Sequence, residues 1–450
     1  MAAQVPRKIS IAVIGGGIGG LALVLAIQRF CDLSKLTINV YESASQISQI
    51  GAGINIWERV YHMLEKLGLE ADISSLLNEG QNMSWFCRKS DQPEGVPMRT
   101  IIFKEAGRML LLHRADVQDV FLKHISPEVK IHLSHRLESF SHTEDVIEKI
   151  KLKFKDGKEA RCDLLVGADG VHSVVRRQLL PYLADKLTRP ELRESAEAVF
   201  SGSKVYRDLV PAEELAKAWP GHPVLGKPHI YCGKGKHVVT YPISQGRFIN
   251  VVPFYTDLSL EYAPFKGSQI GQATTKEILE NFSEWEPEVR ALLGCMQRPS
   301  HWSVLTLKPF DTWAADGVVL IGDAAHAMTP HVGAGACEAI EDGYVLAQIL
   351  ARAQRKDPFE ILSDETMSLY NRLRTPIGNF VQARARLQVR FYEFDEEGGD
   401  FSLLDKDSPV LRERDRLLKL SLGIEDGYMW HQHKVICETD AAVEQALSSL

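Results

Sequence analysis

A glycine-rich turn between a buried strand and a buried helix limits the possible folds more than any other feature of the sequence. Residues 9–14 (ISIAVI) form a β-branched apolar run typical of a buried parallel strand, and residues 21–30 are apolar enough for a buried helix. Between them stands Gly15-x-Gly17-x-x-Gly20. Gly15 permits the tight turn, Gly17 lets the backbone approach a pyrophosphate, and Gly20 lets the helix pack against the strand. The positive end of the helix dipole then faces the phosphates.

An acidic residue completes this unit. Residues 37–41 (TINVY) predict a second strand, which ends at Glu42 and closes a βαβ unit. Glu42 follows the motif at a spacing of about twenty residues, where its carboxylate can accept hydrogen bonds from an adenosine ribose. The sequence therefore predicts a bound dinucleotide with a free ribose, FAD or NAD. A glycine-rich turn with a purely structural role is the alternative.

Two later segments also run from a buried strand into an aspartate next to glycine. The first ends at Asp169 and the second at Asp323. An aspartate at the C-terminal edge of a parallel strand lies where open α/β sheets bind ligands. Gly333 and Gly335 precede or begin a helix expected at 334–353, and they offer a second backbone cradle at a positive helix end.

Composition and charge argue against several kinds of partner. The net charge is -7 and no block of Lys or Arg stands out, so nucleic acid is not an expected partner. No apolar run reaches the ~18 residues needed to span a bilayer. The 7 cysteines are scattered without a CxxC pair, which indicates reduced thiols, a cytoplasmic protein and no metal site.

The middle of the chain follows a different pattern. Between residues 199 and 265, short alternating runs such as 237–242 and 248–253 are separated by Pro and Gly, which predicts a mostly antiparallel sheet. Parallel strands are expected on both sides of this region, so we expect two interleaved domains. A long Arg-rich helix is expected at 363–392.

These motifs carry a family resemblance. The glycine motif with Glu42, the Asp169-Gly170 stretch and the Gly322-Asp323 stretch together resemble the group A flavoprotein aromatic hydroxylases. The wording GDAAHAMTPHVGAGACEAIEDGYVLA and the run LHRADVQ, which contains Arg114, are similar to the salicylate hydroxylase branch. The resemblance extends from about residue 8 to about residue 390, with the motifs in the family's order.

The resemblance implies an α/β fold like that of para-hydroxybenzoate hydroxylase. A Rossmann-type FAD-binding domain is expected to be interleaved with a mostly antiparallel β substrate domain and followed by C-terminal helices. The expected segments are FAD-binding at 8–80, 111–185 and 306–390, substrate-domain at 81–110 and 186–305, and a helical tail at 391–450.

The resemblance also implies contacts along FAD, from the adenosine ribose to the flavin ring. Glu42 would contact the ribose, Arg114 would reach the FAD, and Asp323 would meet its ribityl or pyrophosphate region. Gly335 and Ala336 would lie near the flavin ring, and the loop at 51–54, with Ala52 and Gly53, would pass the isoalloxazine. Asp169 would shape the site shared with a transient nicotinamide cofactor.

Plainer roles stay open for three of these residues. Asp169 could be a turn residue, and Asp323 could cap the helix that follows it. Arg114 could pair with a carboxylate such as Asp116.

One strand of the substrate domain is the best candidate for the chemistry. On an alternating strand at 236–242, His237, Val239 and Tyr241 face the same side. His is easily tuned near neutral pH, and Tyr can donate, accept or relay a proton. Related aromatic-acid hydroxylases place His and Tyr four apart here, facing substrate. A hydrogen-bonded sheet histidine and a core tyrosine are the alternative.

A second histidine is a candidate substrate contact. His331 follows Pro330, as in the salicylate hydroxylase branch, and we expect it to meet the phenol or carboxylate of the substrate. A loop histidine that holds a backbone carbonyl is the alternative. His326 is expected to be structural, and His229, Tyr231 and Arg247 are weaker pocket candidates.

The resemblance implies a specific reaction. The chain is expected to be an FAD-dependent monooxygenase that consumes NADH or NADPH and molecular oxygen and hydroxylates a phenolic aromatic acid through a C4a-hydroperoxyflavin. Hydroxylation would occur ortho to the phenol, or at the carboxyl-bearing carbon with loss of CO2. The nicotinamide cofactor is expected to bind transiently, because the sequence has no second GxGxxG motif, and the protein is expected to be a monomer or homodimer. The alternatives are oxygenation of a larger secondary-metabolite phenol or enol, and a flavoprotein that does not insert oxygen.

Overall fold

The computed structural model describes residues 7–395 except 48–52, 78–83, 103–108, 146 and 266, together with Ile424, Ala441 and Gln445. Ala52 and nearly all of the expected tail at 391–450 therefore lie outside the described residues. Within this part of the chain, no helix has the length and apolar character required for a membrane span.

A six-stranded sheet carries the glycine-rich turn. Its strand order is β18-β19-β11-β1-β2-β7, and every neighbouring pair is parallel except β18 with β19. All six residues of β1 are buried, as the apolar run predicts. The strands are β1 (Ile9–Ile14), β2 (Leu36–Tyr41), β7 (Lys130–His132), β11 (Leu164–Gly167), β18 (Ala314–Ala315) and β19 (Val318–Leu320).

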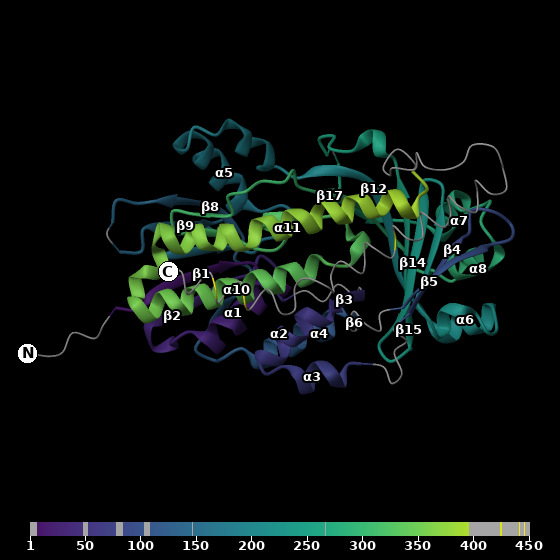
Figure 1. Ribbon diagram of the computed structural model, residues 1–450, viewed down its shortest axis with the longest axis horizontal. Coiled ribbons are helices and arrows are strands. Elements are labelled where there is room, and N and C mark those ends of the chain that lie inside the picture. The colour runs from purple at the N-terminus through teal and green to yellow at the C-terminus, as the bar shows by residue number, and fades with distance from the viewer. Residues whose placement is uncertain are drawn as a thin grey trace, which may run out of the picture.

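Two helices lie together beside this sheet. Helix α1 (Ile18–Phe30) follows the glycine-rich turn, and α10 (Gly335–Lys356) packs closely along it (Figure 1). Gly343 permits the close approach, because a Cβ atom there would lie 2.8 Å from the Cα of Leu23. Helix α11 (Asp364–Tyr392) runs along the long axis from the six-stranded sheet to the second large sheet (Figure 1).

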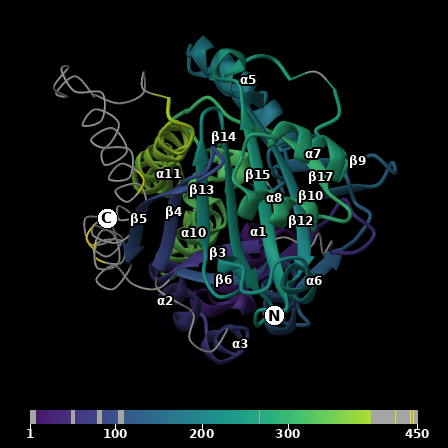
Figure 2. The same ribbon diagram turned by 90° about the vertical axis from the view of Figure 1, so that its right-hand side faces the viewer.

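The second large sheet has eight strands in the order β16-β17-β12-β15-β14-β13-β4-β5. Its pairs are antiparallel except β13 with β4. Helices α6, α7 and α8 cover the face turned toward the viewer in Figure 2. The bounds are β4 (Ser84–Lys89), β5 (Val96–Ile102), β12 (Val199–Pro211), β13 (His229–Gly233), β14 (Lys236–Ile243), β15 (Phe248–Thr256), β16 (Ile270–Gln272), β17 (Ser300–Thr306), α6 (Ala212–Ala218), α7 (Thr275–Asn281) and α8 (Pro287–Gly294).

Smaller elements complete the described chain. They are the ribbon of β3 (Gly53–Trp57) and β6 (Met109–His113), the sheet of β8 (Leu137–His142), β9 (Ile150–Phe154) and β10 (Glu159–Cys162), the helices α2 (Glu58–Lys66), α3 (Glu70–Ser75), α4 (Arg114–His124), α5 (Val174–Lys186) and α9 (Asp323–His326), and the 3-10 turns η1 (Leu33–Lys35), η2 (Pro190–Ser195), η3 (Pro223–Leu225), η4 (Leu258–Leu260), η5 (Pro330–Val332) and η6 (Pro358–Leu362).

The expected α/β class, with a parallel sheet and a mostly antiparallel sheet, is confirmed. Two local expectations differ from the structure. The first helix begins at Ile18, three residues before the apolar run at 21–30, because Gly17 is its N-cap. The segment at 51–54 was expected to be a loop, but Gly53 begins strand β3, which pairs with β6.

A buried ionic network fixes α10 to its surroundings. The guanidinium of Arg374 on α11 binds three acids of α10: Glu338 at 2.7 Å, Glu341 at 2.6 Å and Asp342 at 2.7 Å. Arg59 of α2 binds Glu338 at 3.0 Å and also contacts Glu341. The side chains of Arg374 and the three acids are fully buried.

Asp342 extends this network to the loop after β19. Its carboxylate accepts hydrogen bonds from the ring of His326 at 2.6 Å and from the backbone N–H of Gly322 at 2.8 Å. Burial lowers the pKa of His326, but the Asp342 carboxylate more than offsets this, so the pKa is raised overall. Burial would raise the pKa of Asp342, but His326 and Arg374 hold it at about 2. With a protonated His326, the Asp342 carboxylate is paired with two buried cations, His326 and Arg374.

We expect Asp342→Asn to lower the free energy of unfolding by about 3 kcal/mol or more near pH 6, because Arg374 and His326 would lose a buried anion. The folded-state pKa of Asp342, about 2, lies below its ordinary value of 3.8. Its stabilisation is therefore present above about pH 4 and is lost as the pH falls toward about 2.

Urea unfolding of wild type and variant at a series of pH values measures this difference, which should shrink over that window. Asp364→Asn, at an exposed position in the first turn of α11, is the matched control and should change little. A difference between wild type and Asp342→Asn that is independent of pH would contradict the assigned role.

Candidate active site

A cavity of about 390 Å³ lies between the glycine-rich turn and the eight-stranded sheet. One end is formed by Gly17 and Gly19 at the start of α1, and the other by side chains of β12, β14 and β15. The loop that precedes α9 and the start of α10 form a third wall. The parallel sheet therefore supplies backbone to the cavity, and the antiparallel sheet supplies side chains.

The three motif glycines occupy positions where larger residues meet different obstacles. Gly15 has a φ of +111°, and a Cβ atom there would lie 2.2 Å from the carbonyl oxygen of Ala168. A Cβ at Gly20 would lie 2.1 Å from the carbonyl oxygen of Gly15. At Gly17 no atom lies within 4 Å of a Cβ position, and this residue lines the cavity. Gly15 and Gly20 serve the fold, and Gly17 leaves room for a ligand.

The carboxylates of Glu42 and Asp169 accept hydrogen bonds from backbone N–H groups. The Glu42 carboxylate accepts hydrogen bonds from the N–H of Gly16 at 2.9 Å and of Ala44 at 2.8 Å, which places it beside the glycine-rich turn. The Asp169 carboxylate accepts hydrogen bonds from Ser173 and from the first N–H groups of α5. Burial raises the pKa of Asp169. Its neighbours Ala168 and Gly170, rather than its carboxylate, line the cavity.

Arg114 and Asp323 both line the cavity, and both are exposed. Arg114 is the first residue of α4, and the nearby Asp116 hydrogen-bonds to His113 rather than to Arg114. Asp323 begins α9, whose N-cap is Gly322. Arg114 therefore does not pair with Asp116, and Asp323 does not cap α9, as the sequence had left open. Both side chains are available to a ligand.

The start of α10 closes the cavity near the flavin end expected from the sequence. Gly335 and Ala336 line it, together with Gly333 in the left-handed conformation at a φ of +60°. A Cβ at Gly333 would lie 2.4 Å from the side-chain nitrogen of Asn55 on β3. Gly53, on the same strand, lines the cavity and donates its N–H to Asn250 at 3.3 Å.

The eight-stranded sheet presents a regular face to the cavity. Across β14 and β15, Tyr241 is paired with Asn250, Val239 with Val252 and His237 with Phe254. On β12, Val205 is paired with Phe254, and Arg207 lies two residues further on the same side. All of these residues except His237 line the cavity: Val205, Arg207, Val239, Tyr241, Asn250, Val252 and Phe254.

Arg207 is the cation on this face. It is half-buried, and its guanidinium lies 5.9 Å above the ring of Trp302. No carboxylate of the described residues forms an ion pair with it. Burial lowers its pKa, which Tyr241 opposes and Arg114 reinforces. Within the described part of the chain, Arg114 and Arg207 therefore line the cavity without a carboxylate partner.

Tyr241 reaches across to the β3 strand. Its hydroxyl lies so close to Gly53 that a Cβ atom there would be only 2.3 Å away. Burial raises the pKa of Tyr241 to about 12. The phenol therefore stays protonated at neutral pH and can donate or accept a hydrogen bond in the cavity.

His237 lies behind the cavity wall. Its ring stacks on Phe254 with centroids 4.3 Å apart and lies 5.1 Å from the ring of His331, and both neighbours line the cavity. Its Nδ1 is 2.8 Å from the carboxyl of Glu393, just beyond α11. The backbone carbonyl of His331 accepts a hydrogen bond from Tyr392 at 2.9 Å. The structure therefore places Tyr241 and His331 in the cavity lining, and it places His237 behind Phe254 and His331, outside that lining.

The weaker sequence candidates have other partners. Tyr231 packs on the opposite face of the sheet, where its hydroxyl donates to Glu288 at 2.6 Å. His229 hydrogen-bonds to the carbonyl of Lys227. Arg247 lies in an exposed turn, bound to the carbonyl of Ser244.

Sequence analysis missed Asn55, Arg207, Asn250 and Glu393. The alternation that singled out Tyr241 applies equally to β12 and β15, so Arg207 and Asn250 could have been found from the expected strand pairing. Glu393 lies 156 residues from His237 along the chain, and no local pattern links the two.

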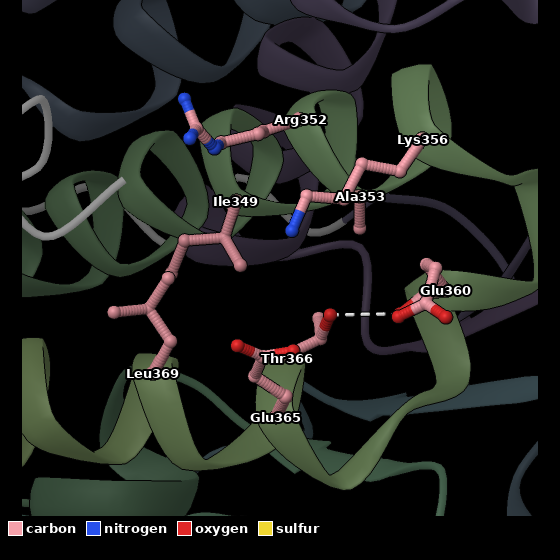
Figure 3. A pocket seen from close by; sticks show the side chains of 8 residues that line it. All are labelled: Ile349, Arg352, Ala353, Lys356, Glu360, Glu365, Thr366 and Leu369. Carbon is pink, nitrogen blue, oxygen red and sulfur yellow. Dashed lines mark hydrogen bonds between the residues drawn. The ribbon is translucent and has the colours of Figure 1, made fainter. Parts of the chain in front are cut away.

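Neither a metal site nor the small hollow beside α10 offers a second active site among the described residues. No group of three or more His, Cys, Asp or Glu among the described residues is arranged to hold a metal ion. A second hollow of about 20 Å³ lies between α10, η6 and α11 (Figure 3). It has room for about one water molecule.

The cavity fits FAD. The open space at Gly17 faces a helix N-terminus, as a pyrophosphate requires. Arg114 and Asp323 would offer a cation and an anion to the phosphates and sugar hydroxyls, and the backbone of Gly335 and Ala336 would lie near the flavin. Beyond the flavin, the apolar and polar side chains of the sheet would enclose space for a substrate.

Comparison with known proteins gives the same result. Residues 8–186 and 228–382 match the FAD binding domain family. Salicylate hydroxylase of Pseudomonas putida is 31% identical over 97% of this chain and 94% of its own. 6-Methylsalicylate 1-monooxygenase of Aspergillus terreus is 29% identical over 87% of this chain and 84% of its own. A solved salicylate hydroxylase substrate complex has a TM-score of 0.77 and 25% identity, and it covers 98% of both chains.

We expect Gly17→Ala to keep the stability of the protein without FAD but to weaken FAD binding by about tenfold or more, because the added methyl group meets no protein atom and occupies ligand space. Gly20→Ala should also lower the melting temperature, because overpacking against Gly15 costs about 1–3 kcal/mol. Melting curves without FAD and flavin titrations measure the two effects.

Gly226→Ala is the control, since it also meets no atom within 4 Å but lies away from the cavity lining. Equal FAD affinity in Gly17→Ala and Gly226→Ala would contradict the cradle at Gly17.

Proposed function

The chain belongs to the FAD binding domain family and is a flavin-dependent monooxygenase, and from this premise we propose that its substrate is a phenolic aromatic acid. FAD, once reduced by NADH or NADPH, supplies the oxygen-activating chemistry. The protein's part is to hold FAD, orient the aromatic ring, exclude water and take up the phenolic proton.

The cofactor roles proposed for the chain follow from the cavity. Gly15, Gly17 and Gly20 form the turn for the pyrophosphate, and Glu42 stands beside that turn for the ribose. Arg114 and Asp323 would bind the phosphate and ribityl region, and Gly53, Gly335 and Ala336 would face the flavin ring. Asp169, whose carboxylate holds the start of α5, would shape the site from behind, where a nicotinamide cofactor would bind only transiently.

The position of Arg207 in the cavity is the main support for an acidic substrate. A half-buried arginine that has no carboxylate partner among the described residues favours an anion in the cavity, and a planar guanidinium matches a carboxylate well. Val239, Val252 and Phe254 surround it with apolar surface suited to an aromatic ring. The relatives' names, salicylate hydroxylase and 6-methylsalicylate 1-monooxygenase, also describe phenolic acids.

Tyr241, His331 and His237 are proposed to handle the phenol. The Tyr241 hydroxyl, protonated at neutral pH, would position the phenolic oxygen by a hydrogen bond. His331 would contact the same oxygen from the cavity wall. His237, behind it, would accept the phenolic proton, because an electron-rich phenolate is the better partner for oxygen transfer.

We expect a hydroxybenzoate to accelerate anaerobic reduction of the bound flavin by NADH and, after oxygen is admitted, to gain one oxygen atom. Stopped-flow absorbance and product mass, with salicylate and its positional isomers as the panel, measure this. A product heavier by one oxygen but lacking CO2 would identify hydroxylation at the carboxyl-bearing carbon. Flavin reduced equally slowly with every member would contradict the proposal and favour a larger phenol, an enol or a flavoprotein that does not insert oxygen.

We expect Arg207→Gln to raise the KM for a phenolic carboxylate by roughly 10- to 100-fold, the size of one charge-assisted hydrogen bond. Effects on phenols without a carboxylate should be small. Steady-state NADH oxidation with both classes of compound measures this selectivity. Arg207→Lys keeps the charge and should recover part of the loss, and Arg247→Gln, at an exposed turn, should match the wild type. An equal loss for both classes would show that Arg207 serves the fold or the flavin instead.

A further inference from the structure

A buried carboxyl group with no role assigned so far is hydrogen-bonded to His237. Glu393 follows the last turn of α11 and is 4% exposed. One of its oxygens, Oε1, lies 2.8 Å from His237 Nδ1 and 2.9 Å from the hydroxyl of Thr256 on β15. Both neighbours can donate to this oxygen. The carboxyl is therefore held by two strands of the substrate sheet.

The hydrogen-bond pattern favours one tautomer of the imidazole. Oε1 accepts a hydrogen bond from Thr256, so His237 is best satisfied when Nδ1 carries a proton and donates it to the same oxygen. The other ring nitrogen, Nε2, is buried and has no hydrogen-bond partner among the described residues. A buried nitrogen without a partner is uncommon, and here it lies in a ring that packs on two cavity-lining residues, Phe254 and His331.

We propose that Glu393 is a positioning residue for His237: it holds Nδ1–H so that Nε2 is free to accept the proton of a bound phenol, and in its ionised form it takes up the Nδ1 proton as this happens. This rests on the proposed function, in which His237 is the proton acceptor.

The protonation states of the pair support this role. Burial alone lowers the pKa of His237 to about 3, which would make an isolated imidazole a poor base. Burial raises the pKa of Glu393 to about 8, which Thr256 opposes and Asp395 reinforces. Below about pH 8 the carboxyl is neutral, and above it the carboxylate stabilises positive charge on the imidazole. The hydrogen-bonded pair thus takes up one proton as a unit.

Other titratable or charged groups face the pair but are further removed or have partners of their own. They are His331 from η5, Tyr392 and Arg390 from α11, Asp395 beyond it, and Cys232 and Lys234 from the β13–β14 hairpin. Asp395 is bound to Arg390 at 2.7 Å, and the Lys234 ammonium binds the carbonyl of Phe394. Asp395 is the neighbour that shifts the pKa of Glu393 without contacting His237.

The proton transfer balances without another reactant. The phenolic O–H bond breaks and an Nε2–H bond forms. The Nδ1–H proton moves to Oε1 of the ionised Glu393, which leaves a neutral imidazole, a neutral carboxyl and a phenolate. The phenol has thus lost one proton to Nε2, Glu393 has gained one from Nδ1, and no electrons have been exchanged.

The test compares the pH dependence of kcat in the FAD-loaded enzyme, with salicylate as the probe. In the wild type, kcat should rise as the pH passes through about 8. In Glu393→Gln this rise should be absent, and at pH 9 kcat should fall roughly 10- to 100-fold while KM changes little, because the amide accepts Nδ1–H but takes up no proton. A pH profile of Glu393→Gln like that of the wild type would overturn the proposal.

Asp395→Asn is the matched control, since it removes an acid two residues away that does not contact His237. It should keep the kcat plateau and move the rise to lower pH. His237→Asn separates the two hypotheses: an unchanged kcat there would refute His237 as the proton acceptor and overturn this inference with it. A loss in His237→Asn without a loss in Glu393→Gln would refute only the role of Glu393.

The tautomer of His237 gives a second readout that does not depend on turnover. In ¹⁵N-histidine-labelled protein without FAD, the signals of His237 are identified by their loss in His237→Asn. We expect protonated Nδ1 and unprotonated Nε2 in the wild type and in Glu393→Gln, and a mixture of tautomers in Glu393→Ala. The same single tautomer in Glu393→Ala would overturn the positioning role.

Discussion

The contact between Arg374 and three acids of α10 is the interaction on which the cavity depends. A buried guanidinium bonded to Glu338, Glu341 and Asp342 fixes the rotation of α10 about its axis, because only one face of the helix can present all three acids. That rotation determines where Gly335 and Ala336 meet the cavity. Through Asp342, the same cluster binds the N–H of Gly322 and the ring of His326. It thereby fixes the position of α9, which begins at Asp323.

The two sheets supply different chemical groups to the cavity. Parallel strands end at one edge, and there the chain supplies backbone N–H groups and glycines, which suit a long anionic cofactor of fixed shape. The antiparallel sheet presents alternate side chains over a broad face, so a few substitutions on β12, β14 and β15 can change the ring that it accepts. Under the proposed function, substrate choice would therefore depend on residues such as Arg207 and Tyr241, and the cofactor cradle on glycine positions.

Sequence analysis predicted the fold and the FAD cofactor because their signals are local. The strand, the glycines and the helix lie within about twenty residues, and each is dictated by chain geometry. The substrate wall was predicted only in part. Tyr241 and His331 were found from short patterns, but Arg207 and Asn250 face the cavity through strand pairing that spans more than forty residues. Glu393 was missed because tertiary packing, and no repeat or motif, brings the end of α11 to His237.

Helix α11 explains how these distant features are kept in register. From Arg374 to Glu393 it extends about 28 Å at 1.5 Å per residue, from the ionic network to the substrate sheet (Figure 1). Between these ends, Gln382 donates to the carbonyls of Leu307 and Ala327, and Tyr392 donates to that of His331. This helix, anchored to α10 by Arg374, thus sets the depth at which Glu393 meets His237. A shift in its register would move Glu393 relative to His237 and Arg374 relative to the three acids of α10.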